Sequence, residues 1–310
     1  MSSFLNSVSS VAIIFLLTAT GYVCATLKWM GPEVKAFISR YLMRLAIPVM
    51  CVHSLTKNLS HELVLSSGKL LLLSTVGMAF CLAFALLAGK LLRLPRNRFG
   101  VFVMMASFSN ALFIGYAMCS ELFGEVCTPY VMLFYLVNTS CVQLIGISFV
   151  RWSGENGGFS MQMLKKFFTA PTVLSVFLGF AMVLMDWTLP PLLNSFAGYI
   201  SNTVTPLALL LTGYIIYEIG LKNLRVDKSL AVVMFARFIF SPAICLVLCS
   251  AFDVTGLARS VLTVEFTMPV VTQTVVASAE YGADAQYAAR GAAVTTLASF
   301  LVIPVLMLML

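Results

Sequence analysis

The chain alternates between long apolar runs and short polar connections over its 310 residues. An apolar run of about 20 residues is long enough to cross the hydrocarbon core of a bilayer as a helix. The pattern is therefore that of an all-α membrane protein. Runs of this length predict ten membrane-spanning helices, at residues 8–27, 36–55, 68–89, 99–122, 128–150, 167–187, 191–216, 229–251, 258–279 and 286–310.

Composition agrees with this pattern. Hydrophobic residues make up 60% of the chain and charged residues 10%, with a mean hydropathy of +0.99, whereas a typical soluble domain has about 25% charged residues. The longest polar connection, residues 151–166, leaves no room for an ATPase or receptor domain. The eight cysteines form no Cys-x-x-Cys pair and only two histidines occur, so we expect no resident metal or other cofactor.

Lysine and arginine are distributed unevenly between alternate connections. If the N-terminus is extracytoplasmic, the outer connections hold only Lys57, Lys69 and Arg259. Positive residues gather on the cytoplasmic side of membrane proteins, so this bias predicts ten spans with both termini extracytoplasmic. It also accounts for most of the net charge of +7 without a nucleic-acid partner. The inner connections hold Lys28, Lys35, Lys90, Arg93, Arg96, Arg98, Arg151, Lys165, Lys166, Lys222, Arg225 and Lys228.

The two halves of the chain, residues 1–150 and 167–310, are weakly similar. Each half contains five predicted spans, and an odd number of spans makes the halves cross the bilayer in opposite directions. We therefore predict two inverted five-helix repeats joined by a cytoplasmic loop at 151–166, a plan typical of secondary transporters. A shift of 158 residues aligns Gly21 with Gly179, Pro48 with Pro206, and Asn138 with Thr296.

The fourth predicted span is interrupted by Ser109 and Asn110, with Gly115 shortly after them. Ser and Asn side chains compete for backbone groups, and glycine lowers the cost of leaving a helix, so the helix is expected to unwind here. The free N–H groups of the second half-helix would then attract a carboxylate. The alternative is a continuous helix in which Ser109 and Asn110 bond to neighbouring helices.

The ninth predicted span is interrupted at Pro269. Pro269 has no N–H to donate, and its ring crowds the carbonyl of Glu265, four residues earlier. An ionisable residue within a span indicates function by default, so Glu265 with Thr267 predicts a site for a small cation or a proton. Thr272 and Gln273 extend this polar cluster and are candidate substrate-binding residues.

Glu265 also has a purely structural interpretation. Arg237, in the eighth predicted span, lies at a similar depth, so the two side chains are candidates for an ion pair. Ion binding and ion pairing are compatible if binding breaks the pair. Asn138 and Thr139 in the fifth span join the candidate substrate-binding residues because they lie near the interruptions, although such residues often only connect helices.

Six short motifs follow one another at characteristic spacing along the chain. They are Ile47-Pro48, the stretch from Ser109 to Gly115, Ala170-Pro171, the stretch from Thr205 to Gly213, the stretch from Met268 to Val276, and the stretch from Ala279 to Gly282. On these motifs the chain resembles the auxin efflux carrier family, which includes bacterial malonate and malate permeases. The resemblance covers almost the whole chain.

The resemblance implies two inverted five-helix halves, a scaffold and a transport domain, broken fourth and ninth helices that cross, and frequent homodimers. Carried over by position, Asn110 and Pro269 are the crossover residues and Gln273 lies near the substrate. The chain departs from the family pattern at Leu112, where a glycine is frequent, and at Ala117, where a proline is frequent.

The stretch from Glu265 to Met268 also resembles part of the sodium site of the fold-related bile acid symporters, so sodium is a candidate coupling ion beside the proton. We expect a secondary transporter that moves small organic anions, mono- or dicarboxylates such as malonate or malate, across the plasma membrane (the inner membrane in a bacterium) by a rocking or elevator motion. The alternative is a sodium-coupled symporter of larger amphipathic anions of the bile acid type. No His-Glu-x-x-His or Gly-x-Ser-x-Gly motif occurs, and we expect no enzymatic activity.

Overall fold

The computed structural model describes residues 2–59, 61–154, 161–220 and 225–308. Within these residues the regular elements are helices and no strand is formed; the β-type contact is an isolated antiparallel bridge between Ser109 and Val270. The predicted all-α class is confirmed. Residues 155–160 of the predicted connecting loop and the predicted inner residue Lys222 lie outside the described residues.

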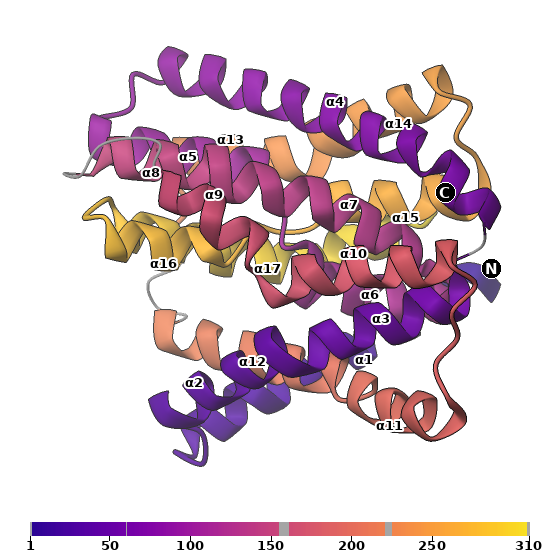
Figure 1. Ribbon diagram of the computed structural model, residues 1–310. Coiled ribbons are helices and arrows are strands. Elements are labelled where there is room, and N and C mark those ends of the chain that lie inside the picture. The colour runs from indigo at the N-terminus through magenta and orange to yellow at the C-terminus, as the bar shows by residue number, and fades with distance from the viewer. Residues whose placement is uncertain (1, 60, 155–160, 221–224, 309–310) are drawn as a thin grey trace.

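The helices pack side by side in one bundle (Figure 1). Several consecutive helices form one longer stretch that a π-helical segment or a turn divides. In chain order the α-helices are α1 (Ser2–Thr26), α2 (Pro32–Tyr41), α3 (Ile47–Asn58), α4 (His61–Leu91), α5 (Arg96–Ser107), α6 (Tyr116–Phe123), α7 (Thr128–Cys141), α8 (Ile147–Ser153), α9 (Met161–Phe168), α10 (Pro171–Leu184), α11 (Pro191–Ser201), α12 (Val204–Ile219), α13 (Lys228–Phe235), α14 (Ser241–Ala251), α15 (Gly256–Thr267), α16 (Gln273–Glu280) and α17 (Ala285–Leu306).

Short π-helical segments divide several of these stretches. Segments of this kind are frequent at functional sites. Pro48 and Pro242 explain two of them, because a proline offers no N–H to the carbonyl four residues earlier and the preceding turn widens. The segments are η1 (Leu42–Ala46), η2 (Ala111–Gly115), η4 (Val142–Gly146) and η6 (Ala236–Phe240), and a 3₁₀ turn, η3 (Glu125–Cys127), precedes α7.

Helical stretches long and apolar enough to cross a bilayer number seven among the described residues, so the protein is a multi-pass membrane protein. The number is lower than the ten predicted because spans 99–122 and 258–279 are each divided into two half-helices, and span 167–187 is divided before α10. The seven are Ser9–Thr26, Pro32–Asn58, Ser67–Leu91, Glu125–Ser153, Pro191–Ile219, Lys228–Ala251 and Ala285–Leu306, and two shorter apolar helices are Ala111–Phe123 and Pro171–Leu184.

The bundle has two sides, and α6, α15, α16 and α17 lie between them. In Figure 1, α1, α2, α3, α11 and α12 lie along the lower side, and α4, α5, α13 and α14 along the upper side. On the lower side α1 packs against α12 at Gly21 and Gly213. A Cβ atom on Gly213 would lie 2.0 Å from the carbonyl oxygen of Thr18. The two backbones therefore touch, as is common where membrane helices cross at small residues.

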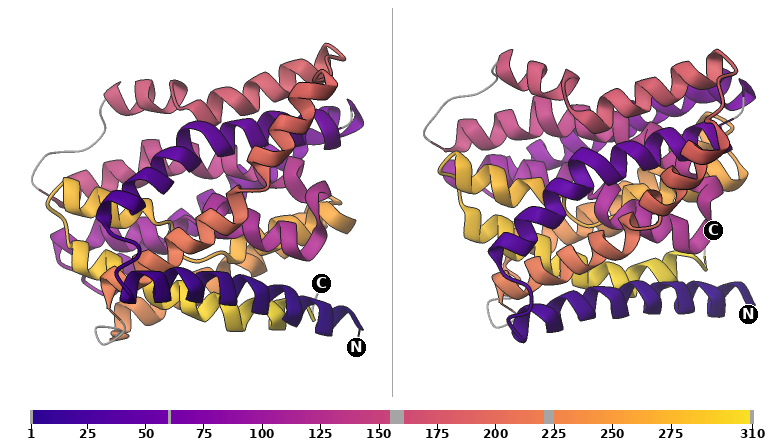
Figure 2. Two further views of the ribbon diagram at one scale, coloured as in Figure 1. Left: turned by 90° about the horizontal axis from the view of Figure 1, so that it is seen from below. Right: turned by 60° about the horizontal axis from the view of Figure 1, so that its bottom comes forward.

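Both termini lie at one end of the bundle, as Figure 1 and both views of Figure 2 show. Ion pairs join helices at the opposite end, where the described basic connections gather. Lys35 Nζ lies 2.5 Å from Glu218 Oε2, and Arg98 Nε lies 2.6 Å from Asp284 Oδ2. These pairs hold the start of α2 to the end of α12, and the start of α5 to the residue before α17.

Candidate functional site

Two non-helical segments lie against each other in the middle of the bundle. Residues 108–110 separate α5 from η2, and residues 268–272 separate α15 from α16. The two segments run antiparallel, and the N–H of Asn110 donates to the carbonyl oxygen of Pro269 at 2.8 Å. Both predicted interruptions are thus present, and they cross each other. The alternative of a continuous helix through Ser109 is wrong.

The first segment is held by one side chain from α7. The Nδ2 of Asn138 donates to the carbonyl oxygen of Ser109 at 2.8 Å, and the Oδ1 of Asn138 accepts from the N–H of Ser109 at 3.3 Å. Both residues are buried, at 3% and 1% exposure. A buried peptide group outside a helix needs such partners, so Asn138 replaces the hydrogen bonds that Ser109 loses by leaving the helix.

The second segment is held from α17. The N–H of Val270 donates to the hydroxyl oxygen of Thr295 at 3.1 Å, and that hydroxyl donates in turn to the carbonyl oxygen of Gly291 at 2.7 Å. The Nδ2 of Asn110 donates to Thr272 Oγ1 at 2.9 Å and links the two segments through side chains. Thr295 therefore supplies a hydrogen-bond partner to the backbone of the second segment, as Asn138 does for the first.

Arg237 of η6 is almost fully buried, with 1% of its surface exposed. Its Nη2 donates to the carbonyl oxygens of Phe266 and Met268, both at 2.8 Å, and its Nε donates to Met268 at 3.0 Å. Its Nη1 donates to the carbonyl oxygen of Ser107 at 3.3 Å. One guanidinium thus donates hydrogen bonds to carbonyl oxygens at the C-terminal ends of both α5 and α15, where backbone acceptors lack helical partners.

A cavity of about 50 Å³ lies beside the crossing. A volume of this size has room for a few water molecules. Six of the seven predicted substrate-binding residues line it, whereas Pro269 contributes through the bond of its carbonyl to Asn110. The lining residues are Met43, Ser109, Asn110, Ala111, Leu112, Phe113, Tyr135, Asn138, Thr139, Val142, Val271, Thr272 and Gln273.

Two helix N-termini border this cavity. The first residues of η2, Ala111 to Phe113, line it on one side, and Gln273, the first residue of α16, lines it on the other. The first N–H groups of a helix have no partner within the helix and carry a partial positive charge. The C-terminal ends of α5 and α15, which carry the opposite partial charge, are bound to Arg237 instead. The cavity is therefore suited to an anion.

Glu265 and Thr267 do not line the cavity. The carboxyl group of Glu265 is fully buried against the backbone of Gly115, where an added Cβ would lie 2.6 Å from both carboxyl oxygens. Its Oε1 accepts a weak hydrogen bond from the thiol of Cys119 at 3.7 Å. The hydroxyl of Thr267 donates to the carbonyl oxygen of Thr263 at 2.7 Å, within its own helix. The structure thus separates the candidate coupling residues from the candidate substrate residues.

The predicted ion pair between Arg237 and Glu265 is not formed among the described residues. The guanidinium is directed to carbonyls at the ends of α5 and α15, and no nitrogen of Arg237 lies within 4.0 Å of a Glu265 oxygen. The predicted depth of Arg237 brought it close to the crossing. Which acceptors it uses depends on helix orientation, which the sequence pattern does not define.

The sequence did not predict that π-helical segments would contribute residues to the site. Met43 of η1, Val142 of η4 and the first residues of η2 line the cavity, and η6 carries Arg237. The prolines that follow η1 and η6 were the available signal for two of these segments. Thr295 is a further residue of the site, because its hydroxyl is the one that reaches the second segment.

A larger hollow of about 700 Å³ lies toward the end of the bundle that carries the basic connections, between α12 and the start of α17. Arg225, Arg290 and Glu218 line it, together with Ile219. A narrow gap of about 10 Å³ shares Ile219 with this hollow and Thr272 with the central cavity. The gap therefore lies between the hollow and the central cavity. Residues of α12 and α17 line the hollow and the gap, whereas the residues that line the central cavity belong to neither helix.

Comparison with known proteins gives a consistent result. The sequence model of a family described as membrane transport protein matches residues 6–307. A protein described as an uncharacterized transporter from Methanocaldococcus jannaschii is 25% identical over 297 residues, which cover 94% of this chain and 95% of the relative. A second uncharacterized transporter, from Methanothermobacter thermautotrophicus, is 23% identical over 309 residues, covering 97% of each chain.

Proposed function

The chain belongs to the membrane transport protein family, that is, the auxin efflux carrier family, and from this premise we propose that it is a secondary transporter of small organic anions, mono- or dicarboxylates such as malonate or malate. The substrate binds in the cavity beside the two crossing segments. Ser109, Asn110, Asn138, Thr139, Thr272 and Gln273 provide the polar contacts, and Pro269 holds the crossing in place.

The observation that carries the proposal is the electrostatic arrangement of the crossing. The N-termini of η2 and α16 border the cavity, whereas the carbonyl ends of α5 and α15 are bound to Arg237. A carboxylate in the cavity meets partial positive charge and hydrogen-bond donors from both broken helices. Broken helices of transporters recognise anionic substrates in the same way.

The size of the cavity favours small anions over the alternative of a bile acid-type substrate. A space of about 50 Å³ has to expand even for a dicarboxylate, and a sterol-sized ligand would require much more of the packed core to move. The row of spaces through Thr272 and Ile219 to the hollow with Arg225 and Arg290 supports a path for anions along α12. Positive side chains in such a hollow raise the local anion concentration.

The architecture that we propose has ten membrane spans in two inverted halves, residues 1–150 and 167–310, with both termini extracytoplasmic in the plasma membrane. Two findings support it: the termini lie at one end of the bundle, as an even number of spans requires, and the two crossing segments are held in similar ways by Asn138 and Thr295. Transport follows a rocking or elevator motion of one group of helices against the other. Homodimer formation stays a prediction.

The test is a ligand panel on the purified protein followed by transport in proteoliposomes. Malonate and malate should raise the midpoint of heat unfolding, and labelled malonate should enter the vesicles with saturable kinetics that unlabelled malate inhibits. A bile acid should do neither. Stabilisation and uptake with the bile acid, and none with the dicarboxylates, would reverse the assignment of substrate class.

A further inference from the structure

Glu265 is a buried carboxyl group that the proposed substrate site does not use. None of its surface is exposed, and its Oε2 has no hydrogen-bond partner in the described structure. Its Oε1 has only the thiol of Cys119. An ionised carboxylate without a partner is costly in such surroundings. The site therefore requires something that neutralises the charge, either a cation or a proton.

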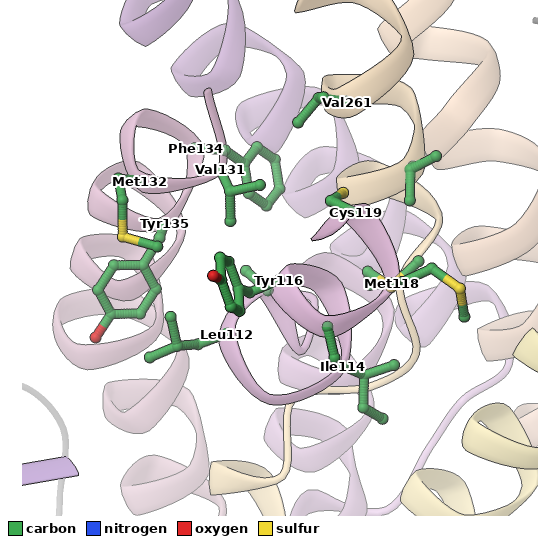
Figure 3. Close-up of a cluster of buried hydrophobic side chains, with 14 of the residues drawn as sticks. Leu112, Ile114, Tyr116, Met118, Cys119, Val131, Met132, Phe134, Tyr135 and Val261 are labelled. Carbon is green, nitrogen blue, oxygen red and sulfur yellow. The ribbon is translucent and has the colours of Figure 1, made fainter. Parts of the chain in front are cut away.

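The surroundings of this carboxyl group do not fit a sodium ion. Hard cations take several oxygen ligands, but the contacts described for the carboxyl are its close approach to the backbone of Gly115 and its bond from the thiol of Cys119. Figure 3 shows Cys119 among apolar side chains, including Phe134 and Val261. The hydroxyl of Thr267 is bonded within its own helix. Among the described residues no group of three or more His, Cys, Asp and Glu is placed so that it could hold a metal ion.

Three carbonyl oxygens at the end of α15, those of Glu265, Phe266 and Met268, already accept hydrogen bonds. Phe266 accepts from Arg237 and from the hydroxyl of Ser241 at 2.8 Å, and Met268 accepts two bonds from Arg237. The carbonyl of Glu265 itself accepts from the N–H of Met268 at 3.3 Å. The guanidinium of Arg237 thus occupies, as a cation of the chain itself, the position that a coupling cation would take at the crossing.

From this geometry we propose that Glu265 binds a coupling proton, that no sodium ion binds there, and that the proton moves together with the substrate anion. The proposal rests on the proposed function and names its coupling ion. A proton needs one oxygen and no coordination shell, which is what the enclosed Oε2 provides. The proton comes from water on one side of the membrane, forms an O–H bond with the carboxylate, and returns to water on the other side.

Cotransport, rather than exchange, follows from the charges at the crossing. The titratable groups that interact with Glu265 are Arg237 from η6, Cys119 from α6 and Cys127 from η3. Arg237 brings one positive charge, whereas an ionised Glu265 and a bound carboxylate substrate would together bring at least two negative charges. Protonation of Glu265 removes one of them, so the proton and the anion load together.

Two measurements on the full-length protein test this proposal separately from the proposed function. The first is infrared spectroscopy of the substrate-free protein in lipid vesicles, compared with Glu265→Gln and with the control Glu33→Gln, which removes an exposed carboxyl from the first turn of α2. The wild type should show a protonated carboxyl band that responds to pH and that Glu265→Gln alone lacks. Absence of such a band would overturn the proposal whatever the transport result.

The second measurement is the uptake of labelled malonate by proteoliposomes under imposed gradients. An acidic exterior should drive accumulation several-fold above equilibrium, and replacement of sodium by choline should leave it unchanged. Glu265→Gln should lose this accumulation while keeping downhill flux, because glutamine has the same size and no titratable proton. Sodium-dependent uptake, accumulation driven by an alkaline exterior, or full accumulation by Glu265→Gln would contradict the proposal.

The two measurements also distinguish failure of the proton site from failure of the proposed function. A pH-responsive band of Glu265 without malonate uptake would support the proton site and count against the proposed substrate. Uptake that is independent of both gradients, with no band, would leave the transport function standing and remove Glu265 as the coupling group.

Discussion

The two crossing segments both contain buried peptide groups without helical hydrogen bonds, and different side chains supply the missing partners. At the first, a neutral amide from α7, Asn138, satisfies both the N–H and the C=O of Ser109. At the second, a hydroxyl from α17, Thr295, satisfies one N–H, and the guanidinium of Arg237 satisfies the carbonyls. The first segment is therefore held by a neutral side chain, and the second has a buried positive charge beside it.

This difference explains how a chain with a weak internal similarity produces an asymmetric site. Two identical neutral supports would leave the carbonyl ends of both broken helices available to a cation from solution. Because Arg237 also reaches the carbonyl of Ser107, the last residue of α5, one side chain connects the ends of the two half-helices and places a positive charge between them. The cavity on the other face of the crossing is then left with helix N-termini and neutral donors, which is the environment that an anion requires.

The largest effect is expected from removal of the guanidinium. Arg237→Ala leaves the three buried carbonyls of Ser107, Phe266 and Met268 without its hydrogen bonds, which should lower the free energy of unfolding by about 3 kcal/mol or more. Heat unfolding in detergent, followed by size-exclusion chromatography, measures the change. Arg237→Lys keeps the charge but cannot reach all three acceptors, so it should recover only part of the loss.

The matched control for this comparison is Arg40→Ala. Arg40 is exposed and its Nε bonds to the carbonyl of Ala36 within the same helix. Its removal should shift the unfolding midpoint very little. Equal shifts for Arg237→Ala and Arg40→Ala would show that the buried guanidinium does not support the crossing.

A smaller effect is expected at the first segment. Asn138→Ala removes two hydrogen bonds to Ser109 and should lower the free energy of unfolding by about 2 kcal/mol. It should also reduce uptake of malonate, because Asn138 lines the cavity. Asn194→Ala, at an exposed position of α11, is the control. Unchanged stability of Asn138→Ala would mean that water or another residue satisfies Ser109 equally well.

The smallest effect is expected at Thr295. Thr295→Val keeps the shape of the side chain and removes one hydrogen bond from Val270, which corresponds to about 1 kcal/mol of unfolding free energy. Thr212→Val is a close control, because the hydroxyl of Thr212 bonds only to Ala208 in its own helix. If both variants lose the same stability, the bond to Val270 contributes nothing beyond the local helix.

Much of the crossing was predictable because its causes are local in the sequence. Pro269 cannot donate a hydrogen bond within a helix, and Ser109 with Asn110 favours an unwound backbone, so the two interruptions could be located from residue chemistry alone. The structure places the first at residues 108–110 and the second at residues 268–272. Proximity to these interruptions then identified Asn138 and Thr139 as residues of the site.

The partners across the crossing could not be predicted in the same way. Depth in the membrane placed Arg237 near Glu265, but depth leaves the rotation of a helix undefined, and the rotation directs the guanidinium to backbone carbonyls instead. The π-helical segments make these partners harder still to predict, because each segment shifts the direction in which the side chains after it point. Two of the three predicted spans that are not continuous are divided by the same breaks that form the site.

The most direct test of the account is the uptake of labelled malonate by vesicles that contain Asn110→Ala or Pro269→Ala, in equal amounts to wild type and to the control Asn194→Ala. The account predicts a loss of at least about tenfold in Asn110→Ala, since one hydrogen bond to a charged ligand contributes about 1.5 kcal/mol or more. It predicts a loss in Pro269→Ala as well, because alanine has an N–H and allows the helix to continue through the break, and normal uptake in Asn194→Ala. Uptake at the wild-type rate in both crossing variants would contradict it, because transport would then not depend on the crossing.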